Sequence, residues 1–137
     1  MRLASYKGEW HDRRMSPRRA AIEMLHAVLV ERGTLDEVSP TRTASLSEND
    51  GRFALMLTLT TLRHLGQVDA LLATYLDKPL PEKRAQVLHA LRVGVVQLLW
   101  LQTPAHAAVH ETVEAIKKGK DAGLSRLVNA VLQRSAR

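Results

Sequence analysis

The sequence has 137 residues, the length of one ordinary domain, and 45% of them are apolar, which is enough to form a buried core. It carries a net charge of +6 and contains no cysteine, and this excludes disulfide frameworks, thiolate metal sites and cysteine nucleophiles. No signal-peptide pattern opens the chain, and its most apolar stretch, residues 93–101, has about half the length of a membrane span, so we expect a cytoplasmic protein without a membrane partner.

The first residues are predicted to form an arm followed by a helix. Residues 1–15 show no apolar periodicity, which predicts a disordered basic arm. Ser16 and Pro17 predict a helix start, because a capping hydroxyl followed by proline is typical of a first turn. Arg18 and Arg19 then lie where the helix dipole disfavours cations, and an anion bound there would explain them.

The middle of the chain is predicted to hold a loop and two helices. Residues 34–46 read as a short apolar fragment followed by a polar loop. A helix follows from a variant capping box at Ser47 to about His64, and its many threonines indicate burial by tertiary packing. Gly66 breaks the run, a shorter helix covers residues 68–76, and two prolines then divide the domain into halves.

Three helices are predicted in the carboxyl half. The first covers residues 82–101 and is apolar nearly all round after Arg92, which is typical of a central buried helix. Further helices are predicted over residues 105–118 and 124–134, and no segment alternates like a strand. The predicted fold is therefore all-α, a compact bundle of six to seven helices over residues 16–137.

The basic residues gather at the two ends of the chain. Residues 1–20 hold six Lys/Arg and two Asp/Glu, and residues 115–137 hold six Lys/Arg and one acid, whereas residues 21–114 hold eight basic and eleven acidic residues. If the fold brings the ends together, they form one cationic surface suited to a phosphate backbone. The alternative is that both ends are merely solvated or frayed.

Arginines around the start of the first helix are the strongest functional signal. Arginine-rich arms that order on binding are common in RNA recognition, and Trp10 and Tyr6 could stack on unpaired bases. The alternative is a leader without a role. The three lysines in residues 117–120 are the next candidates for RNA binding. The predicted RNA-binding residues are Arg13, Arg14, Arg18, Arg19, Lys117, Lys118 and Lys120.

Other polar residues give no chemical site. His106 and His110 are four residues apart, but a zincin needs His-Glu-x-x-His, and here Glu111 follows the second histidine and no third ligand is evident. We predict no metal, no catalytic residue and no cofactor. Glu111 and Asn129 are predicted to be structural groups near the core that bond to each other or to the backbone, and His106 a structural histidine at a helix start.

Several strings in fixed order resemble one known family. The strings are Pro104–Val109 with Glu111, Val113 and Glu114, then Leu127–Leu132, with upstream support from Arg18, Ala20, Ala21, Leu46–Asp50, Thr61–Arg63, Asp69 and Leu72. They resemble the NusB domain family over residues 16–134, in particular the branch that forms the amino-terminal domain of bacterial small-subunit rRNA cytosine-C5 methyltransferases. Three positions depart from the pattern: Gly51 stands where an arginine is usual, Thr60 where a glycine is common, and Gln133 where an arginine is common.

The resemblance implies a helical fold of two sub-bundles and RNA binding through the basic start of the first helix. In the methyltransferase branch the domain would help to hold rRNA for a separate catalytic domain. Free-standing members bind a boxA-type RNA in a nascent transcript together with a small ribosomal protein and support antitermination. The departures put close RNA contacts by the middle helices in doubt.

The methyl-transfer reaction itself needs a cysteine nucleophile and a doubly wound cofactor domain, and these 137 residues contain neither. The sequence therefore predicts a non-enzymatic chain, either part of a methyltransferase or a free-standing antitermination factor. A helical protein–protein docking module is the alternative from another class. A monomer and a weak homodimer both stay open.

Overall fold

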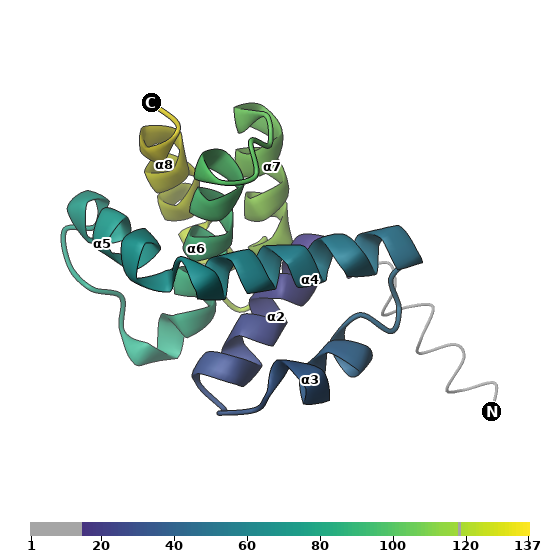
Figure 1. Cartoon of the computed structure of the whole chain (residues 1–137). Helices are drawn as coiled ribbons and strands as arrows, with labels where there is room; N and C mark the ends of the chain where they lie inside the picture. The colour runs from purple at the N-terminus through teal and green to yellow at the C-terminus, as the bar shows by residue number, and fades with distance from the viewer. Residues whose placement is uncertain (1–14, 118) are drawn as a thin grey trace.

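A computed structural model describes residues 15–117 and 119–137, and all regular structure in these ranges is helical. Seven α-helices form a compact bundle (Figure 1), which confirms the predicted all-α fold. They are α2 (Pro17–Leu29), α3 (Leu35–Arg42), α4 (Glu48–Arg63), α5 (Leu65–Tyr75), α6 (Ala85–Leu99), α7 (Ala105–Ile116) and α8 (Ser125–Ser135), with single 3-10 turns η1 (Glu82–Arg84) and η2 (Ala122–Leu124).

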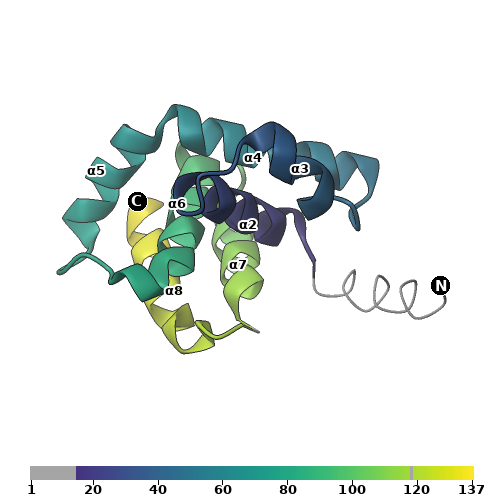
Figure 2. The same cartoon turned by 90° about the horizontal axis from the view of Figure 1, so that it is seen from below.

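Helix α6 is the centre of the bundle, as predicted. It contacts α2, α4, α5, α7 and α8, and nine of its fifteen residues are buried. Helices α3 and α4 lie on one side of it and α7 and α8 on the other (Figure 2). Because α6 faces neighbours in several directions, it is apolar around most of its circumference.

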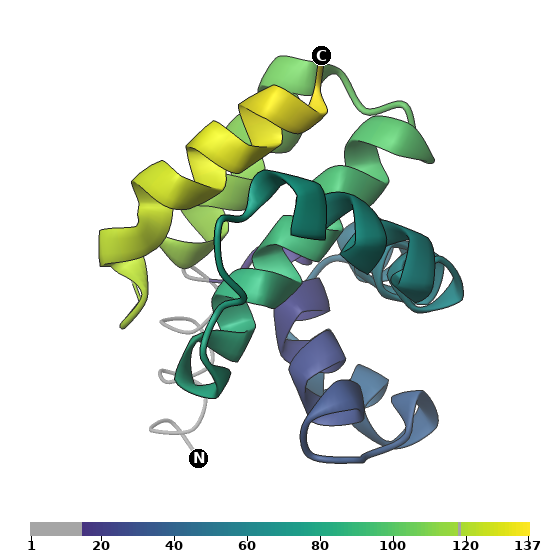
Figure 3. The same ribbon diagram turned by 90° about the vertical axis from the view of Figure 1, so that its left-hand side faces the viewer.

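Helices α6 and α8 approach each other closely (Figure 3). A Cβ atom built on Gly94 would lie 2.5 Å from both Cδ atoms of Leu132, which is itself fully buried. Glycine at this position therefore allows the two helices to pack in contact.

A second, smaller core lies between α2, α3 and α4. It consists of Ala20, Met24 and Ala54, with Leu35 and Val38 of α3 packed against it. The sequence had predicted a polar loop over much of α3. The helix forms because Thr34 and Glu37 make a reciprocal capping box, and two half-buried apolar residues dock it.

Helices α4 and α5 follow each other almost directly. Gly66, predicted as a break, lies in the first turn of α5, and the change of direction occurs at His64. In α4, Thr58 and Thr61 are fully buried and donate to the carbonyls of Ala54 and Leu57, which confirms the predicted burial for these two threonines.

None of the helices in the described ranges combines the length and the apolar character required to cross a bilayer.

Candidate RNA-binding surface

The start of α2 is built as the sequence predicts. Ser16 is the N-cap, its hydroxyl accepts a hydrogen bond from the Arg19 amide at 3.1 Å, and Pro17 occupies the first turn. The described part of the chain places no acidic residue in this first turn. Arg18 and Arg19 are thus held by a defined helix start, with side chains about 100° apart around the axis.

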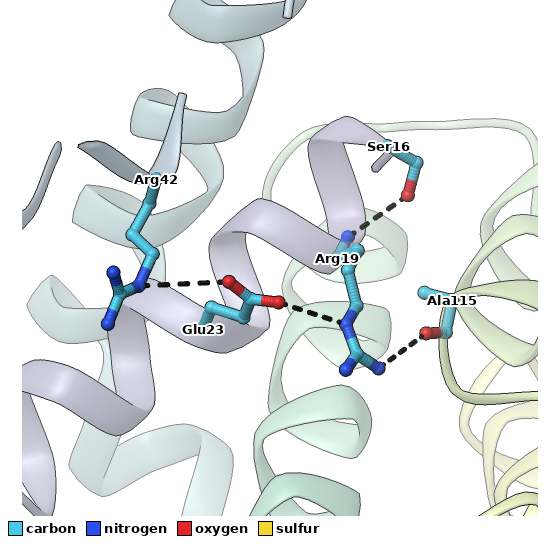
Figure 4. A network of polar contacts seen from close by, with 5 residues as sticks. All are labelled: Ser16, Arg19, Glu23, Arg42 and Ala115. Atoms are coloured by element: carbon cyan, nitrogen blue, oxygen red, sulfur yellow. Dashed lines mark hydrogen bonds and ion pairs between the residues drawn. The ribbon is translucent and has the colours of Figure 1, made fainter. Parts of the chain in front are cut away.

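Arg19 joins α2 to the end of α7 (Figure 4). Its Nη1 donates to the carbonyl of Ala115 at 3.1 Å, and its Nε donates to Glu23 Oε2 at 3.2 Å. The other carboxylate oxygen of Glu23 lies 3.7 Å from Nε of Arg42. One glutamate therefore neutralises part of the charge of two arginines, and all three side chains are partly exposed.

The two basic ends of the chain meet at a small hollow beside Arg19. The hollow has a volume of about 180 Å³ and is lined by Arg19, Gln86, Ile116, Gly119, Lys120 and Asp121. A Cβ atom built on Gly119 would be 3.6 Å from Arg19 Nη1, so the backbone passes close to the guanidinium. Of the two arrangements that the sequence left open, the structure has Arg19 from one basic end and Lys120 from the other lining the same hollow.

An ion pair involves Asp121, one of the residues that line the hollow. Asp121 is buried, with 4% of its surface exposed, and its Oδ1 lies 2.8 Å from Nη1 of Arg84 in η1. Arg84 therefore compensates the carboxylate of Asp121. Of the two cations that line the hollow, Arg19 is partly neutralised by Glu23, and Lys120 is exposed.

The remaining predicted cations have different positions. Lys117 directly follows α7, is exposed and pairs with Glu114 of that helix at 3.2 Å. Arg13, Arg14 and Lys118 lie outside the described residues, as do the predicted disordered arm up to residue 14 and its aromatic residues Tyr6 and Trp10.

Arg18 does not line the hollow and instead contacts residues of α4 and α6. Its Nε donates to Oε1 of Gln97 at 2.9 Å, and its guanidinium carbon lies 5.1 Å from the ring centroid of Phe53. Burial lowers the pKa of Arg18, while the negative charges of Glu111 and Asp50 raise it in part.

Of the predicted structural polar residues, His106 lies at the start of α7 as expected, whereas Glu111 and Asn129 do not lie near the core. His106, Glu111 and Asn129 are all exposed, and no hydrogen bond joins Glu111 to Asn129 in the described ranges. The apolar stripe of α7 runs through Ala108, Val109, Thr112 and Ile116, and that of α8 through Val128, Val131, Leu132 and Ser135, so the three predicted residues lie off these stripes.

The buried polar link between the helices is made by Gln97 and Thr112. Gln97 is fully buried, and its amide nitrogen donates to Oγ1 of Thr112 at 2.9 Å and to the carbonyl of Val93 at 3.1 Å. Both residues occupy core positions of apolar stripes, and this is the sequence signal that could have identified them. In the described ranges no group of three or more His, Cys, Asp and Glu side chains is placed to hold a metal ion.

Known proteins match this chain over nearly all the described residues. The NusB family matches residues 15–137. A "Ribosomal RNA small subunit methyltransferase B" of Pseudomonas putida is 37% identical over 123 residues, which cover 90% of this chain. Proteins of the same name are 34% identical over 119 residues in Vibrio vulnificus and 31% identical over 120 residues in Escherichia coli O1:K1, covering 87% and 88% of this chain. The chain spans 28% of the length of each of these relatives. A helical bundle around a buried α6 and a match over residues 15–137 together identify the chain as a member of the NusB family.

Proposed function

We propose that the chain is an RNA-binding module that helps to hold small-subunit rRNA for a cytosine-C5 methyltransferase centre. Its relatives are named as small-subunit rRNA methyltransferases, and the chain spans only 28% of their length. Without a cysteine the chain lacks the nucleophile that cytosine-C5 chemistry uses. Binding and positioning are therefore the proposed contribution of these residues.

The observation that carries the proposal is the meeting of Arg19 and Lys120 at one hollow. A backbone phosphate is an anion of suitable charge for two cations that converge from distant parts of the chain. Gln86 is a further polar residue that lines the hollow. The hollow is small, about 180 Å³, which fits a phosphate contact rather than a pocket for a base.

Salt dependence of binding tests the proposal. A small-subunit rRNA fragment is titrated with the 137-residue chain at several salt concentrations, and affinity is expected to fall steeply with salt. Arg19→Gln and Lys120→Gln should each weaken binding and reduce the slope of log K against log salt by about 1.

Arg32→Gln is the matched control, because Arg32 is exposed and follows the opposite end of α2. It should leave the slope unchanged. A flat salt response of the wild-type chain would contradict RNA binding and favour a protein-docking module. A clear preference for a boxA-type RNA over the rRNA fragment would instead favour an antitermination factor.

A change at Glu23 gives a second test, in which RNA affinity is expected to rise. Glu23→Gln removes the carboxylate that pairs with Arg19 and Arg42, so both guanidinium groups become better phosphate ligands. RNA affinity should rise by up to about fivefold, since a partly exposed ion pair stores about 1 kcal/mol or less. Glu31→Gln removes the same charge at the far end of α2 and should change affinity little. Equal effects of the two variants would mean that only net charge matters.

A further inference from the structure

We infer that Arg18 is a positioning residue, which fixes the first turn of α2 against α6 and α7 so that Arg19 stays at the hollow, and that it does not itself contact phosphate. This inference rests on the proposed RNA-binding function. It assigns different roles to Arg18 and Arg19, two adjacent arginines that the sequence analysis predicted to bind RNA in the same way.

The contacts of Arg18 form a chain of hydrogen bonds that crosses three helices. Its Nε donates to Gln97 Oε1 in α6, and the amide of Gln97 donates in turn to Thr112 in α7. Gln97 and Thr112 have no exposed surface, so neither can touch RNA. A change at Gln97 can therefore reach the RNA surface only through the protein.

The environment of Arg18 also opposes a move towards phosphate. If the side chain left its position, Oε1 of Gln97 would be buried without its donor, and leaving such a group unsatisfied is costly. The guanidinium would lose its position over Phe53 as well. Among the described residues no comparable buried partner holds Arg19, whose hydrogen bonds run to a partly exposed glutamate and to a carbonyl at a helix end.

The two arginines thus have complementary roles. Arg18 ties the first turn of α2 to the bundle centre, and Arg19, on the next position, reaches the end of α7 and the hollow. When the Arg18 bond is lost, the first turn is free to shift, and Arg19 no longer faces Lys120 across a fixed distance.

A charge-conserving change at Arg18 and a change at the buried Gln97 test this inference, with RNA affinity as the measurement. Arg18→Lys keeps the charge but places a methylene where Nε donates, and Gln97→Leu removes the acceptor. Each should lower RNA affinity about tenfold with an unchanged salt slope, and the double variant should bind no more weakly than either single variant.

The control is Val68→Ala, a core change in α5, which contributes nothing to the hollow. At a temperature where circular dichroism shows every variant folded, it should bind RNA like the wild type. If Gln97→Leu does not fold, Arg18→Lys is sufficient to test the inference. If Arg18 were a phosphate ligand, the lysine would keep its charge, and the variant would keep most of the RNA affinity of the wild type.

Three results would overturn the inference. Wild-type affinity in Arg18→Lys would show that only the charge matters. A slope reduced by about one unit in Arg18→Met, with Gln97→Leu binding like the wild type, would make Arg18 a phosphate ligand. Additive losses of RNA affinity in the double variant would show that Arg18 and Gln97 act independently of each other. If the wild-type chain itself shows no salt-dependent RNA binding, the proposed function fails first, and this is recognised before any variant is compared.

Discussion

At the scale of single residues, the packing around His89 determines the protonation of its ring. It is 1% exposed, its Nδ1 lies 3.1 Å from Nη1 of Arg92, and its Nε2 lies 3.3 Å from Nδ1 of His26. Arg92 can only donate, so a neutral His89 ring accepts at Nδ1 and carries its proton on Nε2. Arg92 is in turn held by two bonds of 2.8 Å to Asp69.

This environment makes stability depend on pH. Burial lowers the pKa of His89 to about 3, with the charges of Arg92 and His26 acting in the same direction and Asp69 opposing them. In the unfolded chain histidine takes up a proton near pH 6.5, so the free energy of unfolding should fall as pH drops from 6.5 towards 3, by at most about 1.4 kcal/mol per pH unit.

Urea denaturation at pH 7 and pH 5 measures this effect. His89→Gln should be less stable at pH 7 but lose less stability between the two pH values than the wild type. His110→Gln, a change at an exposed histidine, should keep the wild-type difference. An identical pH dependence in the His89 and His110 variants would contradict the assignment.

At the scale of helices, the glycines of α6 and α5 have opposite roles. A Cβ atom on Gly94 would collide with Leu132 of α8, whereas one on Gly66 meets nothing within 4 Å. Gly94→Ala should therefore destabilise the protein by about 1–3 kcal/mol, because the fully buried Leu132 side chain has to shift to admit the added methyl group.

Gly66→Ala is the matched substitution, with the same chemical change in a helix. It should stabilise the protein by about 0.5–1 kcal/mol, since alanine favours the helix over the unfolded chain. Both changes are measured by the midpoint and slope of denaturant unfolding. Stabilisation by Gly94→Ala would mean that α6 and α8 can separate without loss.

At the scale of the whole molecule, one ion pair joins distant turns. Arg84 in η1 and Asp121 at the start of η2 are 37 residues apart, and the side chain of Asp121 is only 5% exposed. Asp121→Asn should cost about 1–2 kcal/mol of unfolding free energy, because the buried Asp121 side chain loses the charge that pairs with Arg84.

The exposed pair Glu48–Arg52 is the control, with side chains 87% and 68% exposed. Glu48→Gln should alter stability by no more than about 0.5 kcal/mol, because water screens such pairs. Similar losses in the two variants, measured by thermal unfolding, would show that Asp121 is not held in a special environment.

The sequence by itself determined six of the seven described helices, the central position of α6 and the basic ends of the chain. Helix starts and apolar stripes are local patterns, so Ser16-Pro17 and the run of α6 could be read without a partner. Helix α3 was missed although its capping pair Thr34 and Glu37 is equally local, because its eight residues include no buried side chain.

Only the tertiary structure decided which polar residues meet. Arg19 and Lys120 face one hollow, Arg18 turns to the buried Gln97, and Glu111 and Asn129 turn to solvent. Successive residues of a helix differ by about 100° in direction, so a small rotation of one helix exchanges a buried position for an exposed one. That rotation is set by the packing of the whole core around α6, in which residues distant in sequence, such as Gly94 and Leu132, must fit together.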